Sequence, residues 1–369
     1  MATYRYLTYD LLSNAVLADL PFSDVTYGEV LNKPGSFSGT LPMFGDDAVT
    51  LANIEVGRVG LLVERDGSIV WNGIIWTIDT DVQTQRVRVG AEGTWSYFQR
   101  RIIHPIDPYG DLAGAFAQAG LTGPYYYDAD PLLIARELVT FVQSTAVFGG
   151  LASIHVGTGS ETSSARVEQY EINEMDYRVC GNEIESLAGA WEKGFDFRIV
   201  ASWQAGAISK VLQLGQPHIG TRRPVTYELG RNVTSFSVGW DGKRLAGWVV
   251  GQGKDSIFEH YLNPSYTYPL YDDAHTWGDV DDETRVALLT IDRANKHKIP
   301  LATPRITTND SVDPDIHSLV PGDEVRVVAS YGLLAIDGYY RINAYDVSPG
   351  NDGNASVKVD LAPTELFDE

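Results

Sequence analysis

Hydrophobic and polar residues between positions 57 and 89 are arranged in a way that predicts a β-hairpin followed by a third strand. Two apolar runs, residues 61–63 and 69–78, flank the step Asp66-Gly67, and glycine accepts the positive φ that a tight turn requires. Residues 87–89 then alternate as Val-Arg-Val. Because residues at spacing two point to the same face of a strand, this segment is expected to bury one face.

The same pattern returns near the end of the chain and indicates an internal duplication. Gly322 and Gly338 are separated by the same interval as Gly57 and Gly73, and apolar residues surround each pair. A closing Val357-Lys358-Val359 matches residues 87–89 of the first copy. Repeats of this kind define the architecture of a chain, so they are interpreted before any single motif.

Two shorter matches extend the duplication upstream. Ser36-Phe37-Ser38 is matched to Ser235-Phe236-Ser237, and Asp46-Asp47 is matched to Asp281-Asp282. This alignment gives the second copy an insertion between Phe236 and Gly322 that includes a helix. Short patterns recur by chance in β-rich chains, so the argument depends on the shared order of several features.

The pattern divides the chain into three parts. Residues 1–100 and 223–369 show strand patterns throughout, except for a helical insertion around 278–300 in the second of these parts. Residues 101–222 mix helical and strand patterns and are expected to form a mixed α/β domain. In the first part, Asn32 to Gly35 is expected to interrupt two strands, and Pro42 is expected to end the second of them because it lacks an N–H.

Four helices are predicted from capping and periodicity. Asp46-Asp47 begins a short one, and Asp130-Pro131 begins a longer one, with aspartate as N-cap and proline in the first turn. A third helix ends at Gly194, and a fourth runs from Asp281 to His297 before Pro300. The residues expected on the apolar faces of the last three are Ile134, Leu138, Phe141 and Val142; Ile184, Leu187, Ala188 and Trp191; and Ala287, Ile291 and Ala294.

Composition and charge narrow the function classes. Hydrophobic residues make up 44% of the 369, enough for real cores, and no apolar run is long enough to span a bilayer. The N-terminus lacks the pattern of a signal peptide, and the lone Cys180 is expected to be a small buried residue. A net charge of −21 argues against a surface that grips nucleic acid, but it would suit a wall along which DNA slides, or simply a solvated exterior.

Candidate chemistry is sparse. There is no Gly-x-Ser-x-Gly motif, and residues 251–255 lack the first glycine and the hydroxyl of a phosphate-binding loop, so a strand-to-loop turn is expected there. An acidic cluster is the best candidate for a calcium site, although it lacks EF-hand spacing and a capped helix explains half of it. Its members are Asp272, Asp273, Asp279, Asp281, Asp282 and Glu283. The histidines lack the spacing of a zinc site; they are His104, His155, His218, His260, His275, His297 and His317.

Several stretches resemble a known family. Residues 9–12, 31–42 and 71–76 resemble the N-terminal signature of minor tail proteins from long-tailed phages of actinobacteria, which are similar to the baseplate hub proteins of tailed phages. Residues 322–325 and 338–342 resemble the C-terminal barrel of the same family. The resemblance covers most of the chain and is weakest at 101–180.

The resemblance implies a mainly β fold in which two related β-barrel domains, within 1–100 and 223–369, flank the mixed α/β domain. It implies a structural tail hub at the tail tip of a virion, made in the bacterial cytoplasm, with no catalytic residues, cofactor, metal or membrane anchor. The implied partners are two further copies in a homotrimer, the distal tail protein ring, the tape measure protein and tail-tip or fibre proteins. DNA would pass through the channel without specific binding. The chain stops at Glu369 after the closing strand, so no appended cell-wall-degrading domain is expected.

Two other functions remain open at this point. Paired carboxylates could serve a tail-borne hydrolase of the cell envelope, because acids are abundant and sequence gives no separations. The 20 tyrosines and 8 tryptophans could serve a receptor- or carbohydrate-binding protein, although in β proteins they more often fill cross-strand pairs.

Overall fold

The structure is a computed structural model, and it describes residues 2–44, 54–103, 125–144, 153–171, 178–190, 194–262, 267–278, 280, 282–309, 315–350 and 354–364. The chain is mainly β with a mixed α/β region, as the sequence predicted. It forms two compact units. Unit 1 contains residues 1–223, 308–323 and 343–359, and unit 2 contains residues 224–307, 324–342 and 360–369. The division into three domains at residues 100 and 222 and the two barrels stay predictions.

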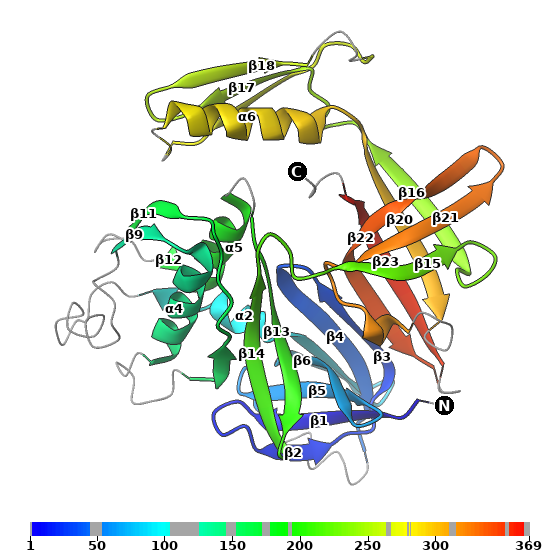
Figure 1. Ribbon diagram of the computed structural model, residues 1–369. Helices are drawn as coiled ribbons and strands as arrows, with labels where there is room; N and C mark the ends of the chain where they lie inside the picture. Colours follow the sequence, from blue (N-terminus) through cyan, green and yellow to red (C-terminus); the bar gives the residue numbers. More distant parts are fainter. Residues whose placement is uncertain are drawn as a thin grey trace. The chain divides into compact units, whose positions relative to one another are not determined.

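An antiparallel sheet forms the centre of unit 1 (Figure 1). The chain segments up to residue 93 contribute seven strands: β1 (Tyr4–Asp10), β2 (Val16–Asp19), β3 (Ser23–Val30), β4 (Lys33–Pro42), β5 (Val59–Arg65), β6 (Ser68–Asp81) and β7 (Arg86–Gly93). Their spatial order is β3-β4-β7-β6-β5-β1-β2. The late part of β22 (Leu334–Pro349) pairs with β3 on its outer edge.

The predicted hairpin at Asp66-Gly67 is confirmed. Arg65 pairs with Ser68, so the turn has two residues, and both Asp66 and Gly67 have positive φ. The hairpin between β3 and β4 was predicted less well. Asn32 takes the left-handed conformation in a two-residue turn, so Lys33 to Gly35 already belongs to β4 and does not interrupt the strands. Strand β4 ends at Pro42 as expected, and the predicted helix at Asp46-Asp47 lies outside the described residues.

Three described helices and seven strands form the mixed α/β part of unit 1. In chain order they are α2 (Trp95–Phe98), β8 (Ile102–Ile103), β9 (Tyr125–Ala129), α4 (Pro131–Ser144), β10 (Val156–Thr158), β11 (Val167–Glu171), β12 (Arg178–Val179), α5 (Cys180–Ala190), β13 (Asp196–Gln204) and β14 (Ala207–Gly215). Antiparallel β13 and β14 form a long ribbon, and β10 joins it in parallel. A single buried cluster contains residues of β1, β5 and β6 together with α4, α5 and the ribbon.

The predicted helix at Asp130-Pro131 is confirmed. The Asp130 carboxylate accepts a hydrogen bond from the Leu132 N–H at 2.9 Å, and the apolar face predicted for α4 is buried. Helix α5 begins at Cys180, whose side chain is fully buried, as expected, and burial raises the pKa of its thiol. Trp191 lies outside the described residues. Among the described helices, none has the length and hydropathy that a membrane-spanning segment needs.

Unit 2 contains most of the strands that follow residue 222, together with the insertion that the sequence predicted among them. The strands are β15 (Arg222–Glu228), β16 (Ser235–Asp241), β20 (Leu301–Asn309), β21 (Glu324–Tyr331), the early part of β22 and the end of β23 (Ala355–Pro363). The insertion between β16 and β20 contains β17 (Trp248–Gln252), β18 (Ile257–Tyr261), β19 (Asp272–Thr276) and α6 (Glu283–His297). Figure 1 shows α6 lying along β17 and β18.

Helix α6 differs slightly from its predicted face. Asp282 is the N-cap, and its carboxylate accepts hydrogen bonds from the N–H groups of Thr284 and Arg285. The buried residues are Val286, Leu289, Thr290 and Ala294. Ala287 and Ile291 are only partly buried, because the helix is rotated so that Val286 and Thr290 contact the sheet of the insertion.

Strand order supports the predicted duplication. Two groups are left out of this comparison: β2, which pairs with β1 at the end of the sheet, and the strands of the insertion. The first set then lies in the order β1-β5-β6-β7-β4-β3, and the second lies in the order β15-β21-β22-β23-β20-β16. When each set is numbered along the chain, the two orders are identical. The β5–β6 and β21–β22 hairpins also share a two-residue turn, and Gly73 and Gly338 face Leu61 and Val327 across them.

The same correspondence corrects the upstream matches. Ser36-Phe37-Ser38 lies in β4, whereas Ser235-Phe236-Ser237 lies in β16, which corresponds to β3. The insertion therefore replaces the two-residue turn between β3 and β4, and Asp281-Asp282 has no counterpart at Asp46-Asp47. The physical reason is that short Ser-Phe-Ser patterns suit any half-buried strand.

Candidate functional site

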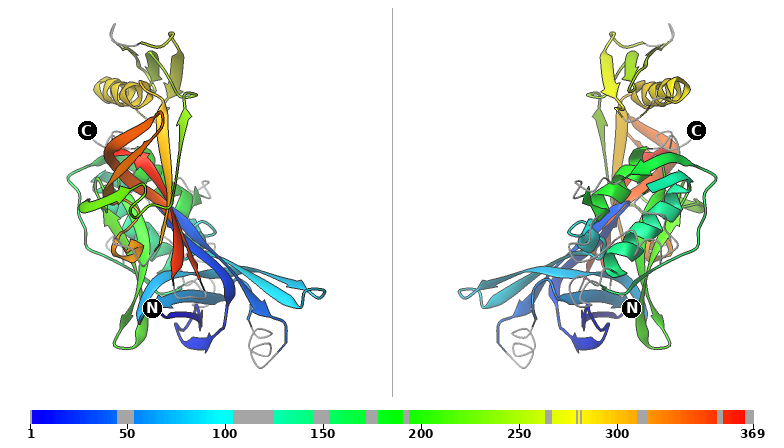
Figure 2. Two further views of the ribbon diagram at one scale, coloured as in Figure 1. Left: turned by 90° about the vertical axis from the view of Figure 1, so that its right-hand side faces the viewer. Right: turned by 90° about the vertical axis from the view of Figure 1, so that its left-hand side faces the viewer.

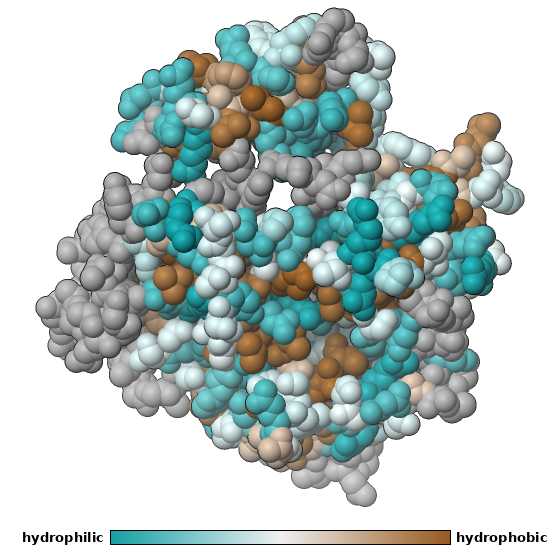
Figure 3. All heavy atoms as spheres, viewed as in Figure 1, coloured by the Kyte–Doolittle hydropathy of each residue, from teal (hydrophilic) through white to brown (hydrophobic). Residues whose placement is uncertain are grey.

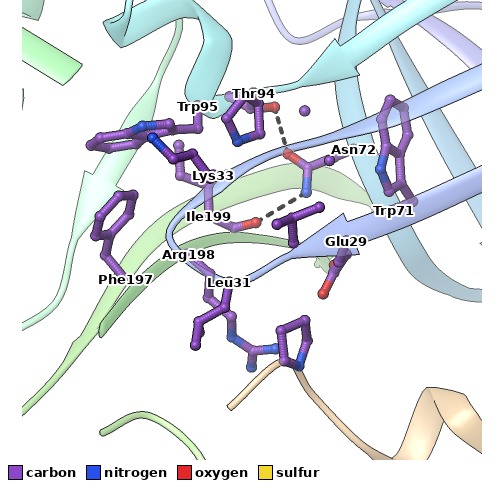
Figure 4. Close-up of a pocket in the computed structure, with 15 residues that line it drawn as sticks. Glu29, Leu31, Lys33, Trp71, Asn72, Thr94, Trp95, Phe197, Arg198 and Ile199 are labelled. Carbon is purple, nitrogen blue, oxygen red and sulfur yellow. Dashed lines mark hydrogen bonds between the residues drawn. The ribbon is translucent and has the colours of Figure 1, made fainter. Parts of the chain in front are cut away.

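A small recess lies where β3, β6, α2 and β13 meet in unit 1 (Figure 4). Asn72 lies at its centre: its Nδ2 donates to the carbonyl oxygen of Ile199 at 3.2 Å, and its Oδ1 accepts from the Thr94 hydroxyl at 2.5 Å. Trp95 and Phe197 pack at 4.3 Å between ring centroids on one side. The recess holds about 40 Å³, which suits ordered water and not a substrate.

A larger hollow of about 470 Å³ adjoins it and also belongs to unit 1. Its polar lining comes from β3, β5, β13, β22 and the segment 315–320, which includes the short helix η2 (Ile316–Ser318). Arg65 donates to the Asp315 carboxylate at 2.7 Å. Glu29 lies opposite Tyr345 in the β3–β22 pairing. Burial raises the pKa of the Glu29 carboxyl. The charge of Arg198 and a hydrogen bond with Tyr345 partly offset this increase.

A histidine and a carboxylate in this hollow resemble part of a catalytic triad but are used differently. His317 Nδ1 lies 2.9 Å from Asp315 Oδ1, and His317 Nε2 lies 2.7 Å from the hydroxyl of Tyr27. Burial raises the pKa of Tyr27 well above its usual value, so its hydroxyl stays protonated. Burial opposes the shift at Asp315, yet hydrogen bonds from His317 and Arg65 lower the pKa of its carboxyl. A row of hydrogen bonds therefore links segments that are far apart in sequence, through Arg65, Asp315, His317 and Tyr27 in this order. We call this row the tie.

The tie flanks a strand pairing that we name the β3–β22 junction. It consists of Tyr27–Val30 paired antiparallel with Ala344–Val347. Gly28 lies opposite Asp346, and a Cβ at Gly28 would lie 2.3 Å from the carbonyl oxygen of Tyr345. The close approach of the two backbones therefore requires glycine at this position. What this site does chemically is hold two strands together.

Of the residues that the sequence singled out, His317 lies in this site, and the described members of the acidic cluster lie elsewhere. Asp273 accepts from Arg293 at 2.5 Å and lies 3.1 Å from His297, so it anchors α6. Asp282 caps the same helix, and Asp279 and Asp281 lie outside the described residues. In the parts of the chain that the structure describes, no three acidic, histidine or cysteine side chains converge as metal ligands do. Residues 251–255 form the end of β17 and a turn, as expected.

The β3–β22 junction was not predicted from the sequence. Its members are scattered over more than three hundred positions, and a polar tie of this kind has no local spacing. One signal was present: Gly28 stands in the middle of an alternating strand, where glycine often marks the close approach of another backbone.

Comparisons with known proteins place the fold. No family model and no curated protein sequence matches the chain. Three solved tail proteins match it over nearly their whole length. The 43 kDa tail protein of prophage MuSo2 from Shewanella oneidensis has a TM-score of 0.66 at 10% identity, with 99% of this chain and 100% of that one covered. The tail protein from Neisseria meningitidis MC58 has a TM-score of 0.61 at 12% identity, with 99% and 98% covered.

The third is prophage tail protein gp18 from Listeria monocytogenes EGD-e, with a TM-score of 0.56 at 12% identity and coverage of 96% and 94%. A chain of the Francisella PdpA–VgrG complex has a TM-score of 0.53 at 9% identity, but only 58% of that chain is covered. The protein therefore has the fold of phage tail proteins, which confirms the predicted fold class. At these identities, the likeness establishes the fold and leaves the function to be argued.

Proposed function

We propose that this protein is a structural tail hub of a long-tailed actinobacterial phage, located at the tail tip. It would join the distal tail protein ring to tail-tip or fibre proteins, contact the tape measure protein and leave a channel for DNA. The observation that carries the proposal is the agreement of two facts: a fold shared with prophage tail proteins over almost the whole chain, and two strand sets with one spatial order.

The duplicated strand order favours a homotrimer. Three chains would present six similar strand sets, which adapts a sixfold tube to a threefold tip. The insertion between β16 and β20 distinguishes the second set from the first, so true symmetry would be threefold. Heterologous contacts generate a ring when their rotation closes. Strand edges that pair between neighbouring chains in such a ring are no longer exposed.

As a tail hub, the protein would have a structural role and would catalyse no reaction. In the candidate site, the side chains of Asn72, Asp315 and His317 form hydrogen bonds with other parts of the same chain. The conclusion predicts no release of sugar or peptide fragments from host cell wall by the purified protein. Release that a single Asp or Glu substitution abolishes would instead establish the hydrolase.

The test of location and stoichiometry uses assembled tails. Gold-labelled antibody against this protein should mark the tail tip, and averaged images should show three copies in one ring. Labels distributed along the tail, labels on no part of the virion, or six copies in the ring would contradict the proposed hub.

The DNA channel carries a separate prediction. The chain has a net charge of −21, and attractive contacts with phosphate require clustered Lys and Arg. We expect the purified protein to cause no retardation of duplex DNA in a gel shift at any salt concentration, with a basic DNA-binding protein as the positive control. Retardation that weakens with salt would contradict a wall along which DNA slides.

A further inference from the structure

We propose that the outer edge of β16 in one chain pairs antiparallel with residues Thr77–Asp81 of β6 in a second copy of the chain. This contact would repeat, between chains, the β3–β22 junction that exists within one chain. The inference rests on the proposed ring, because it names the strands that close it.

Both strands of the proposed contact have equivalents in the β3–β22 junction. By their order in the two sets, β16 corresponds to β3, and β6 corresponds to β22. In the junction, β3 pairs with β22 beyond the point where β21 ends: β21 pairs with residues up to Arg341, and β3 pairs from Ala344. The corresponding edge of β6 also has residues beyond the end of its pairing, because β5 pairs with β6 only up to Ile74.

Both edges lack a strand partner in the described part of the chain. Strand β16 pairs with β20 along one edge and ends the order of its sheet. Residues Thr77–Asp81 pair with β7 alone. Figure 2 shows the light-blue ends of β6 and β7 projecting as a two-stranded ribbon from the unit 1 sheet. Long exposed edges of this kind template pairing with another chain.

A glycine provides the second, independent observation. Gly28 of β3 lies opposite Ser36 of β4, and Gly239 of β16 lies opposite Thr303 of β20. Ser36 and Thr303 each directly precede three alternating buried residues of their strands, so the two glycines hold the same place. At Gly28, a Cβ would lie 2.3 Å from a backbone oxygen of β22. At Gly239, the nearest atom to such a Cβ is the Thr303 hydroxyl at 3.5 Å. Nothing within the described chain requires glycine at 239, whereas a second strand seated there as β22 is seated on β3 would.

The junction also gives the register. The β22–β23 hairpin closes with a hydrogen bond from the Gly350 N–H to the Asn354 carbonyl, and a ladder continued from this bond places Asp346 opposite Lys358. Asp79 lies opposite Arg88 in the β6–β7 hairpin. The matched closing strands pair Arg88 with Lys358, so Asp79 corresponds to Asp346 when both hairpins are counted from these strands. Counted this way, β22 has two more residues than β6 between this position and the matched pair Gly338 and Gly73.

Since Asp346 faces Gly28, the equivalent contact places Asp79 opposite Gly239. Neighbouring pairs follow by counting along both antiparallel strands. Ile78 lies opposite Trp240, and Thr77 lies opposite Asp241. Trp240 is 62% exposed in the single chain, and the contact would cover it with an isoleucine.

Exposed apolar side chains beside the two edges fit the same arrangement. In the single chain, Arg65 at the end of the β5–β6 hairpin binds Asp315 in the segment before β21. The equivalent contact brings the β21–β22 hairpin tip of one chain to the second copy, beside the described residues that flank β4 and β5. Tyr331 is 80% exposed and Leu333 is fully exposed at that tip, and Figure 3 shows hydrophobic atoms there. Phe44 and Val56, two of these flanking residues, are 65% and 49% exposed.

The first test is a disulfide cross-link. The double variant Thr77→Cys with Asp241→Cys places thiols on directly opposite, exposed positions, and cross-strand Cβ atoms lie within the range of a disulfide. Oxidation of the purified full chain should give covalent dimers and trimers in a non-reducing gel, which a reductant converts to monomers. The native Cys180 is buried, so it should not take part in the cross-link.

The matched control is Ile78→Cys with Asp241→Cys, which puts the two thiols on opposite faces of the proposed pair. It should cross-link at least about tenfold less than the first variant. Equal cross-linking by both variants, or a chain that stays monomeric by native mass spectrometry up to its solubility limit, would overturn the pairing. A closed ring without the cross-link would overturn the pairing and leave the tail hub standing.

A second test uses the glycines. Gly239→Val should leave the thermal unfolding of the monomer unchanged and abolish the oligomer, because the side chain would meet the backbone of the second copy. Gly338→Val is the control, since a Cβ at Gly338 would likewise meet nothing closer than 3.6 Å, but this glycine lies opposite Val327 of its own chain and outside the proposed contact. It should assemble as the unmodified chain does. Assembly of the Gly239→Val variant at an unchanged concentration would contradict the proposed contact.

Discussion

Replacing Lys210 by methionine is expected to stabilise the protein by about 3 to 5 kcal/mol at pH 6. Lys210 lies in β14 with 1% of its surface exposed, and its ammonium is 4.9 Å from the centre of the Tyr9 ring. Among the described groups, no hydrogen-bond acceptor reaches its Nζ. Burial lowers the pKa of Lys210 from 10.5 to about 7, so at pH 6 the fold bears a charge that it disfavours. A methionine of similar length removes the charge and keeps the packing.

The pH dependence follows from the same shift. Below pH 7, Lys210 is protonated in both the folded and the unfolded chain, and the cost of burying the charge is constant. Between pH 7 and about 10, the folded chain releases this proton while the unfolded chain keeps it. The unfolded state then binds more protons, so the free energy of unfolding rises with pH in this window. Burial raises the pKa of Tyr9, which reverses the trend above pH 10 because the unfolded tyrosine ionises first.

Urea unfolding followed by circular dichroism at several pH values measures both effects. The difference in unfolding free energy between Lys210→Met and the unmodified chain should be largest at pH 6 and shrink toward pH 10. Lys243→Met is the control, because Lys243 is exposed and its removal should change stability by less than about 0.5 kcal/mol. A destabilised Lys210→Met variant would show that the buried ammonium is satisfied and structurally required.

The elements that the sequence predicted well are those that local chemistry determines. The turn at Asp66-Gly67 needs positive φ, and the helix at Asp130-Pro131 carries its own cap and initiator, so both could be placed to within a residue or two. The duplication stays a prediction, but the two hairpins from which it was inferred do share their turn length. Each turn or helix start is determined by a few neighbouring residues, so tertiary packing had little to override.

The features that the sequence could not provide depend on distant contacts. Ser36-Phe37-Ser38 was matched to the wrong strand, because half-buried strands of one sheet have the same alternation and only pairing distinguishes them. The hydrogen bond between Tyr27 and His317 joins residues 290 positions apart, and nothing in the sequence around either residue predicts the other as its partner. Gly239 looked like any strand glycine until the structure showed that Gly28, its equivalent, is in close contact.

Replacing Trp71 by alanine is expected to destabilise the protein by about 3 to 5 kcal/mol. Trp71 lies in β6 with 2% of its surface exposed, and its ring centroid lies 5.7 Å from that of Phe37. It also covers Gly73, where a Cβ would lie 2.3 Å from the edge of the indole. Truncation would leave a cavity between β6 and β4 that the surrounding strands cannot close, because both are held in the sheet by β7.

The indole also has a polar role that a second substitution isolates. Trp71 Nε1 donates to the carbonyl oxygen of Gly28 at 2.9 Å, and this bond holds β3 at the position where its other edge pairs with β22. Trp71→Phe keeps most of the apolar ring but removes the donor, so it should cost about 1 to 3 kcal/mol. Unfolding in urea, followed by circular dichroism because the change removes a fluorophore, should order the stabilities as unmodified, then Trp71→Phe, then Trp71→Ala.

Trp240→Ala supplies the matched control for both substitutions. Trp240 is 62% exposed, so its loss should change the stability of the single chain by no more than about 0.5 kcal/mol. If Trp240 is covered only between copies, its removal should weaken the oligomer while the monomer unfolds as before. Equal destabilisation of the monomer by Trp71→Ala and Trp240→Ala would contradict the roles assigned to both residues, because burial within the chain is what separates them.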